Sequence, residues 1–146
     1  MADKFYNRPS GFIRASNGFM NWLGSHGLGP RKLIRLTVKG RKSGQPRSVA
    51  VNEVTVNGQR YLVAPRGNTE WARNARVHPD AEIKRGKSEN VTLTELPTNE
   101  RAPVIQQYLR ENAWVTKREF GIDPKAPISE FEKIADKHPV FKITPR

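Results

Sequence analysis

Residues 33–65, LIRLTVKGRKSGQPRSVAVNEVTVNGQRYLVAP, decide the fold because they hold three apolar segments separated by two turn signals. In residues 33–39 apolar and polar side chains alternate, which is the pattern of a strand with one buried face. Asn57-Gly58 is the strongest short hairpin signal in the chain. Residues 61–64 are apolar on both faces, as in a strand that is covered on both sides. The stretch therefore predicts three antiparallel strands in succession.

The middle segment of this stretch changes phase. Val49 and Val51 are the apolar positions before Glu53, whereas Val54 and Val56 are the apolar positions after it. A one-residue shift of this kind within a strand indicates a β-bulge. Because bulges let a sheet curl, the segment favours a sheet that closes on itself.

The rest of the chain alternates between helical patterns and short strands. Ser129-Glu130-Phe131-Glu132 has the form of a capping box that opens a helix. Short strands joined by hairpins, with helices around them, predict an α+β fold, a small antiparallel β-barrel with flanking helices that cover its openings. We expect the helices at residues 10–23, 70–77, 97–109, 112–120 and 129–135, and the further strands at 81–84, 90–96 and 140–144.

The length of 146 residues predicts a single domain, residues 1–146, in which residues 1–8 form a flexible tail. The chain has no cysteine, which excludes disulfides, thiolate metal sites and cysteine nucleophiles. The start lacks the apolar core of a signal peptide, and no segment approaches the ~20 apolar residues of a membrane span. These features predict a cytoplasmic protein, while peripheral association with a membrane and homodimer formation stay open.

The chain is strongly basic, with 26 Lys and Arg against 14 Asp and Glu and a formal net charge of +12. Such a field attracts polyanions. Nucleic acid, an anionic membrane surface and a highly anionic small molecule are all compatible with it. Composition alone does not choose among these partners.

No self-contained catalytic set is visible. His26, His78 and His138 are far apart in the sequence, and none has a partner at metal-ligand spacing, so no metal site is expected. The chain carries neither a G-x-S-x-G elbow nor a P-loop. No catalytic residue is assigned, and if the protein is an enzyme a cofactor carries the chemistry.

The basic turn, residues 40–47 (GRKSGQPR), is the best candidate for a binding site. Gly40 and Gly44 would let backbone N–H groups converge on an anion. If the hairpin from residue 47 to residue 65 is regular, Arg66 lies at the same open end as Arg47. A solvated, non-functional turn is the alternative. The cations that would converge on a phosphate and further carboxylates are Arg41, Lys42, Arg47 and Arg66.

Three segments together carry a family resemblance: residues 40–47, residues 63–67 (VAPRG) and residues 70–74 (EWARN), the last followed by Pro79. In this order they resemble the deazaflavin-dependent nitroreductases, split-β-barrel proteins similar in fold to FMN-binding proteins. Members of that family use the deazaflavin coenzyme F-420. The resemblance extends over about residues 12–146, and it is this resemblance that implies a split barrel.

The resemblance also implies roles for individual residues. The phosphate and glutamate tail of the coenzyme would be held by Arg41, Lys42, Ser43 and Arg47. One wall of the ring site would be formed by the backbone of Ser48, Val49, Ala50, Val51 and Asn52. The opposite wall would be formed by Val63, Ala64, Pro65 and Arg66. The ring pocket would be bounded by Trp71 and Asn74, although core packing is an equally good explanation for Trp71. The candidates for contact with a substrate are Trp114 and Tyr108, the latter also as a proton donor.

The activity implied is that of a deazaflavin-dependent oxidoreductase of the nitroreductase or quinone reductase type. It would transfer hydride from the reduced coenzyme to an electrophilic small molecule, namely a quinone, a nitro compound or an activated enone. Residues 109–120 lack the tyrosines of the family members that reduce nitroimidazoles, which counts against that reaction. The alternatives are an FMN-binding split-barrel reductase, a non-catalytic coenzyme-binding protein and a basic domain that binds nucleic acid. The last is disfavoured because no aromatic side chains alternate with the cations of the basic turn.

Overall fold

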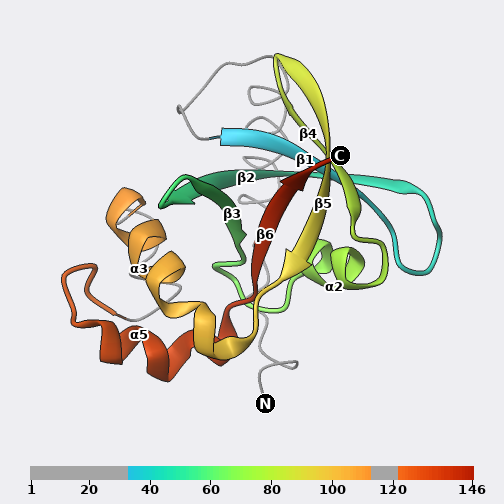
Figure 1. Cartoon of the computed structure of the whole chain (residues 1–146). Helices are drawn as coiled ribbons and strands as arrows, with labels where there is room; N and C mark the ends of the chain where they lie inside the picture. The colour runs from blue at the N-terminus through green and yellow to red at the C-terminus, as the bar shows by residue number, and fades with distance from the viewer. Residues whose placement is uncertain (1–32, 113–121) are drawn as a thin grey trace, which may run out of the picture.

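The computed structural model describes residues 33–112 and 122–146, so the helix expected at residues 10–23 and all but the first residue of the helix expected at 112–120 lie outside the described residues. Six antiparallel strands form a closed barrel in the order β1-β2-β3-β6-β5-β4 (Figure 1), which confirms the predicted fold class. The strands are β1 (Leu33–Lys39), β2 (Pro46–Val56), β3 (Gln59–Val63), β4 (Asp80–Arg85), β5 (Lys87–Glu95) and β6 (Val140–Pro145). The helices are α2 (Glu70–Val77), α3 (Ala102–Glu111) and α5 (Ile128–Ile134), with the short 3-10 helices η2 (Thr98–Glu100) and η3 (Ala135–Lys137).

The barrel separates two hydrophobic cores. The first fills the barrel interior and includes Leu36, Leu62 and Phe141, and the α2 residue Trp71 belongs to it. The second lies where α3 and α5 pack on the outside of the barrel, as in Figure 1, where these helices lie on the side away from α2. The two cores explain why residues 61–64 are apolar on both faces. Leu62 and Ala64 face the first core, while Tyr61 and Val63 face the second.

The two cores also explain the change of phase in β2. Val49 and Val51 pack against the first core, whereas Val54 and Val56 belong to the second. Residues 46–52 pair one-to-one with β1, and residues 53–56 pair one-to-one with β3. The predicted β-bulge is therefore wrong, because the strand changes its strand partner and its core without an extra residue in either ladder.

The helix boundaries agree with the sequence patterns at α2 and differ at α5. Helix α2 spans the predicted residues 70–77, although the hydroxyl of its N-cap residue Thr69 makes no capping hydrogen bond. The capping box predicted at Ser129 is wrong, since α5 begins at Ile128 with Pro127 as its N-cap residue. Proline fixes the extended backbone that an N-cap position requires. No helix in residues 33–112 and 122–146 is long and apolar enough to cross a membrane.

Candidate functional site

The basic turn connects β1 to β2 and is closed by its own hydrogen bonds. The N–H of Gly40 donates to the carbonyl oxygen of Gln45 at 2.8 Å, and the N–H of Gly44 donates to the carbonyl oxygen of Gly40 at 2.9 Å. Gly44 has a φ of 71°, a left-handed conformation that favours glycine. The N–H groups of Gly40 and Gly44 are therefore used inside the turn, and the convergence of backbone N–H groups on an anion stays a prediction for the other residues of the turn.

The side chain of Ser43 packs closely over Gly40. A Cβ atom on Gly40 would lie 2.8 Å from Ser43 Oγ and 3.6 Å from Arg47 Nε. Ser43 Oγ also accepts a hydrogen bond from the N–H of Gln45 at 3.1 Å. A side chain at position 40 would therefore require the hydroxyl of Ser43 to move.

Helix α2 fixes the start of the basic turn. Asn74, which is 4% exposed, accepts two hydrogen bonds from Arg41 at its Oδ1 atom. The backbone N–H and Nη1 of Arg41 are the donors, both at 2.9 Å. Nη1 also donates to Glu70 Oε2 at 2.7 Å. Asn74 is thus a residue that positions the turn across 33 residues of sequence.

The remaining polar side chains of the turn face solvent. Lys42, Ser43 and Arg47 are exposed, while Arg41 is half-buried. The hydroxyl of Ser48, the next exposed residue, lies 2.8 Å from Thr37 Oγ1 on β1. The turn therefore presents an ammonium, a hydroxyl and a guanidinium on a backbone that its internal hydrogen bonds hold in place.

Residues 46–52 of β2 have a strand partner on one edge, β1. Their other edge has no strand partner in the described part of the chain, because β3 pairs only with residues 53–56. We call this second edge of residues 46–52 the open edge. The backbone N–H and C=O groups of a strand edge must be satisfied by water, by another segment or by a ligand. The open edge runs directly into the basic turn.

Residues 63–66, predicted as the opposite wall of the ring site, are hydrogen-bonded to the loop before β6. The N–H of Ala64 donates to the carbonyl oxygen of Pro139 at 2.9 Å, and the Nδ1 atom of His138 lies 3.2 Å from the carbonyl oxygen of Ala64. Burial lowers the pKa of His138 to about 4, so the ring is neutral near pH 7 and its Nδ1–H donates to this carbonyl. Val63 and Ala64 point into the two cores, which leaves Pro65 and Arg66, both half-buried, as the parts of this segment nearer to solvent.

Arg66 does not pair across a regular hairpin with Arg47. The β2–β3 ladder ends at the pair Glu53 and Leu62, and β3 itself ends at Val63. The regular hairpin from residue 47 to residue 65 is therefore wrong. Arg66 lies in the loop between β3 and α2, and its distance from the basic turn is not fixed by strand pairing.

Two aromatic candidates, Trp71 and Tyr108, lie in the cores. Trp71 is 8% exposed, and its ring centroid lies 5.5 Å from that of Phe141 at an interplanar angle of 53°. These contacts favour core packing as the role of Trp71, through which α2 closes one end of the barrel. Tyr108 is 5% exposed in the second core, which favours packing over contact with a substrate. Trp114 lies outside the described residues.

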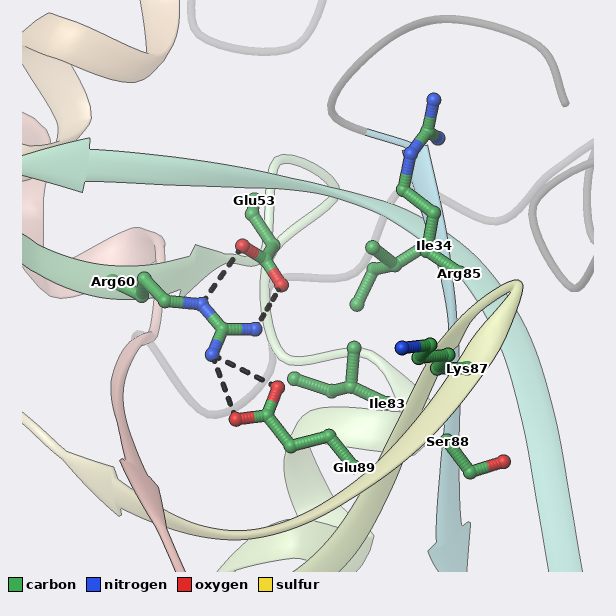
Figure 2. Close-up of a pocket in the computed structure, with 8 residues that line it drawn as sticks. All are labelled: Ile34, Glu53, Arg60, Ile83, Arg85, Lys87, Ser88 and Glu89. Atoms are coloured by element: carbon green, nitrogen blue, oxygen red, sulfur yellow. Dashed lines mark hydrogen bonds and ion pairs between the residues drawn. The ribbon is translucent and has the colours of Figure 1, made fainter. Parts of the chain in front are cut away.

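A second polar cluster, which the sequence reasoning missed, lines a cavity of about 390 Å³ (Figure 2). Arg60 donates to Glu53 through Nη2 at 2.6 Å and Nε at 3.1 Å, and to both oxygens of Glu89 through Nη1 at 2.9 and 3.0 Å. Hydrogen bonding to Glu53 raises the pKa of Arg60 against the opposing effect of burial. Ile34 of this cavity lies near the start of β1, whereas the basic turn follows the end of β1, so the two sites lie toward opposite ends of that strand. In the sequence, the cluster could have been suspected only from Glu53, a charged residue in the middle of an apolar strand at the change of phase.

Among the described residues, no group of three or more His, Asp or Glu side chains could hold a metal ion. The described residues thus offer exposed cationic and hydroxyl groups at the basic turn and backbone hydrogen-bonding groups at the open edge.

Comparison with known proteins bears on the identity of the ligand. A protein-family model described as F420H(2)-dependent quinone reductase matches residues 14–131. A solved structure of an F420-H2 dependent reductase, FDR-A, is 23% identical, covers 77% of this chain and 94% of that chain, and has a TM-score of 0.52. No curated protein sequence matches the chain.

Two further structures show how widely the fold is shared. A putative pyridoxamine 5'-phosphate oxidase from Listeria innocua is 13% identical, covers 79% of this chain and 84% of that chain, and has a TM-score of 0.51. HutZ, the heme storage protein from Vibrio cholerae, is also 13% identical, covers 80% of this chain and 82% of that chain, and has a TM-score of 0.50. At these identities the structures show the fold alone, which is the split barrel of the pyridoxamine-phosphate-oxidase type.

Proposed function

The chain belongs to the F420H(2)-dependent quinone reductase family, and on this premise we propose that the coenzyme lies along the basic turn and the open edge of β2. The chain is an oxidoreductase of this family, and its cofactor is F-420. One observation carries the proposed site. A strand edge without a strand partner in the described residues leads directly into a turn whose exposed side chains are cationic or hydroxylic.

The basic turn has the donors that the coenzyme's tail requires. The tail carries a phosphodiester and several carboxylates, and charge-assisted hydrogen bonds to such groups are among the strongest that proteins make. Lys42, Ser43 and Arg47 are exposed and belong to the same turn. Arg41 has a second role, because Nη1 is its only side-chain nitrogen with a hydrogen-bond partner among the described residues. Its Nε and Nη2 donors would bind an oxyanion in a bidentate manner.

The open edge has the hydrogen-bonding groups that a flat heterocycle requires. Backbone N–H and C=O groups of residues 48–52 would bind the edge of the ring, and the half-buried Pro65 and Arg66 would form the opposite side. When bound in its reduced form, the coenzyme supplies the hydride, and we infer a quinone-type acceptor from the family. The residues of this chain bind, orient and exclude water, and none of the described side chains is assigned a proton-transfer step.

The test is a fluorescence titration of the purified protein with the oxidised coenzyme. We expect micromolar or tighter binding by the wild-type chain. The double variant Lys42→Ala/Arg47→Ala should bind more weakly by about 2–3 kcal/mol, or roughly 30- to 150-fold in Kd, because it removes two charged donors. The matched control Lys125→Ala/Lys133→Ala removes the same charge near α5 and should change Kd far less. No binding by the wild-type chain, or equal losses in both double variants, would overturn the proposed site.

A further inference from the structure

Glu70 places a carboxylate on the basic turn. It is the first residue of α2, and its Oε2 atom lies 2.7 Å from Nη1 of Arg41. Its Oε1 atom lies 4.0 Å from Nη1 of Arg73, one helical turn further on. Among the described residues, Glu70 is the only acidic side chain ion-paired with the basic turn. In a protein of net charge +12, a negative charge at this position lowers the local positive potential.

Arg41 has a second anchor besides Glu70. Asn74 Oδ1, in a residue that is 4% exposed, already accepts from both the backbone N–H and Nη1 of Arg41. The side chain of Glu70 is 57% exposed and lies in the first turn of a helix, where a carboxylate is favourable without any partner. The contact with Arg41 can therefore be given up while the turn keeps its shape and Glu70 keeps a favourable environment.

We propose that Glu70 is a built-in counter-anion that opposes the tail of the coenzyme and sets how quickly the coenzyme leaves. The proposal rests on the proposed function, since it concerns the same site. An enzyme that uses F420H2 leaves the coenzyme oxidised, and the anionic tail is the same in both redox forms. Tight binding of the tail would hold the oxidised coenzyme as firmly as the reduced one. Binding both forms equally tightly does not accelerate the chemical step. A nearby carboxylate weakens the hold on both forms and favours exchange.

The test compares Glu70→Gln with the wild-type chain in coenzyme titrations and stopped-flow dissociation. Glutamine keeps the shape and one acceptor oxygen for Arg41, removes the charge and replaces the second carboxylate oxygen by an NH2 group. We expect Kd to fall by about two- to five-fold, the range set by exposed ion pairs. The dissociation rate should fall by a similar factor. Both differences should shrink between about 50 mM and about 500 mM sodium chloride, because salt screens exposed charges.

Two control variants give the proposal clear ways to fail. Glu132→Gln removes the same charge from an exposed position on α5, which Figure 1 shows on the side of the barrel away from α2. Its effect should stay below about 1.5-fold, because α5 packs in the second core and salt screens charges that are not close to the basic turn. Glu70→Ala removes the acceptor as well as the charge and should behave like Glu70→Gln. Equal effects of Glu132→Gln and Glu70→Gln, or weaker binding in either Glu70 variant, would overturn the proposal.

A failure of the proposed function can be told apart from a failure of this inference. If the wild-type chain does not bind the coenzyme, the proposed site falls. Inorganic pyrophosphate, followed by amide chemical shifts of residues 40–47, then tests Glu70 alone. Tighter pyrophosphate binding by Glu70→Gln than by Glu132→Gln would support the counter-anion role, and no difference between them would refute it.

Discussion

The cluster around Arg60 predicts a loss of stability in Glu53→Gln that leaves coenzyme binding unchanged. Glu53 accepts two hydrogen bonds from Arg60, and its side chain is only 14% exposed. Glutamine offers one carbonyl oxygen, so one of the two bonds is lost and an N–H group then faces the guanidinium. A hydrogen bond to a charged group contributes about 1.5–3 kcal/mol. Because the Arg60 side chain is 32% exposed and water can reach it, we expect the lower part of this range, about 1.5–2 kcal/mol.

The assay is urea unfolding together with a thermal melt. For a chain of this length the expected loss corresponds to a fall in Tm of about 3–8 °C. Glu89→Gln is the matched control, since the Glu89 side chain is 39% exposed and its loss should cost less than about 1 kcal/mol. Arg60→Met should cost more than Glu53→Gln, about 3 kcal/mol, because it leaves a largely buried carboxylate without its counter-charge. A change below about 0.5 kcal/mol in Glu53→Gln, or a larger loss in Glu89→Gln, would refute this reasoning.

Three further predictions concern the site and its supports. Asn74→Ala should cost about 1–3 kcal/mol in unfolding free energy, because it leaves the N–H of Arg41 without its acceptor; it should also weaken coenzyme binding measured by fluorescence, and unchanged binding would argue against a positioning role. His138 has a folded pKa of about 4, below its ordinary 6.5, so the unfolded chain binds the extra proton and stability falls as the pH drops from 6.5 toward 4, by about 3 kcal/mol. Urea unfolding should show a shallower fall in His138→Gln over this window, and an identical slope would contradict the prediction. Trp71→Ala should cost about 3–5 kcal/mol in chemical denaturation because it leaves a cavity in the barrel core, whereas a cost below about 1 kcal/mol would place the ring outside the core.

The sequence predicted most of the local structure that depends on neighbouring residues. The two-residue alternation of residues 33–39 and the Asn57-Gly58 signal gave strands and a hairpin that the structure confirms. The change of phase at Glu53 was correctly located but wrongly explained. Alternation records which face of a strand is buried, and it does not reveal that the strand has changed its core. The error at Ser129 has a different, local cause, because Pro127 supplies the extended N-cap backbone two residues earlier.

The basic turn itself was visible in the sequence, and so was its resemblance to a coenzyme-binding segment, since both depend only on residue types at fixed spacing. Which of its groups are available was decided by tertiary structure. Asn74 and Glu70 reach Arg41 from a helix about 30 residues further along the chain, and their contact exists only because α2 packs at the end of the barrel. The open edge likewise depends on where β3 stops pairing with β2. Barrel closure fixes these long-range contacts, and no local pattern along the chain encodes them.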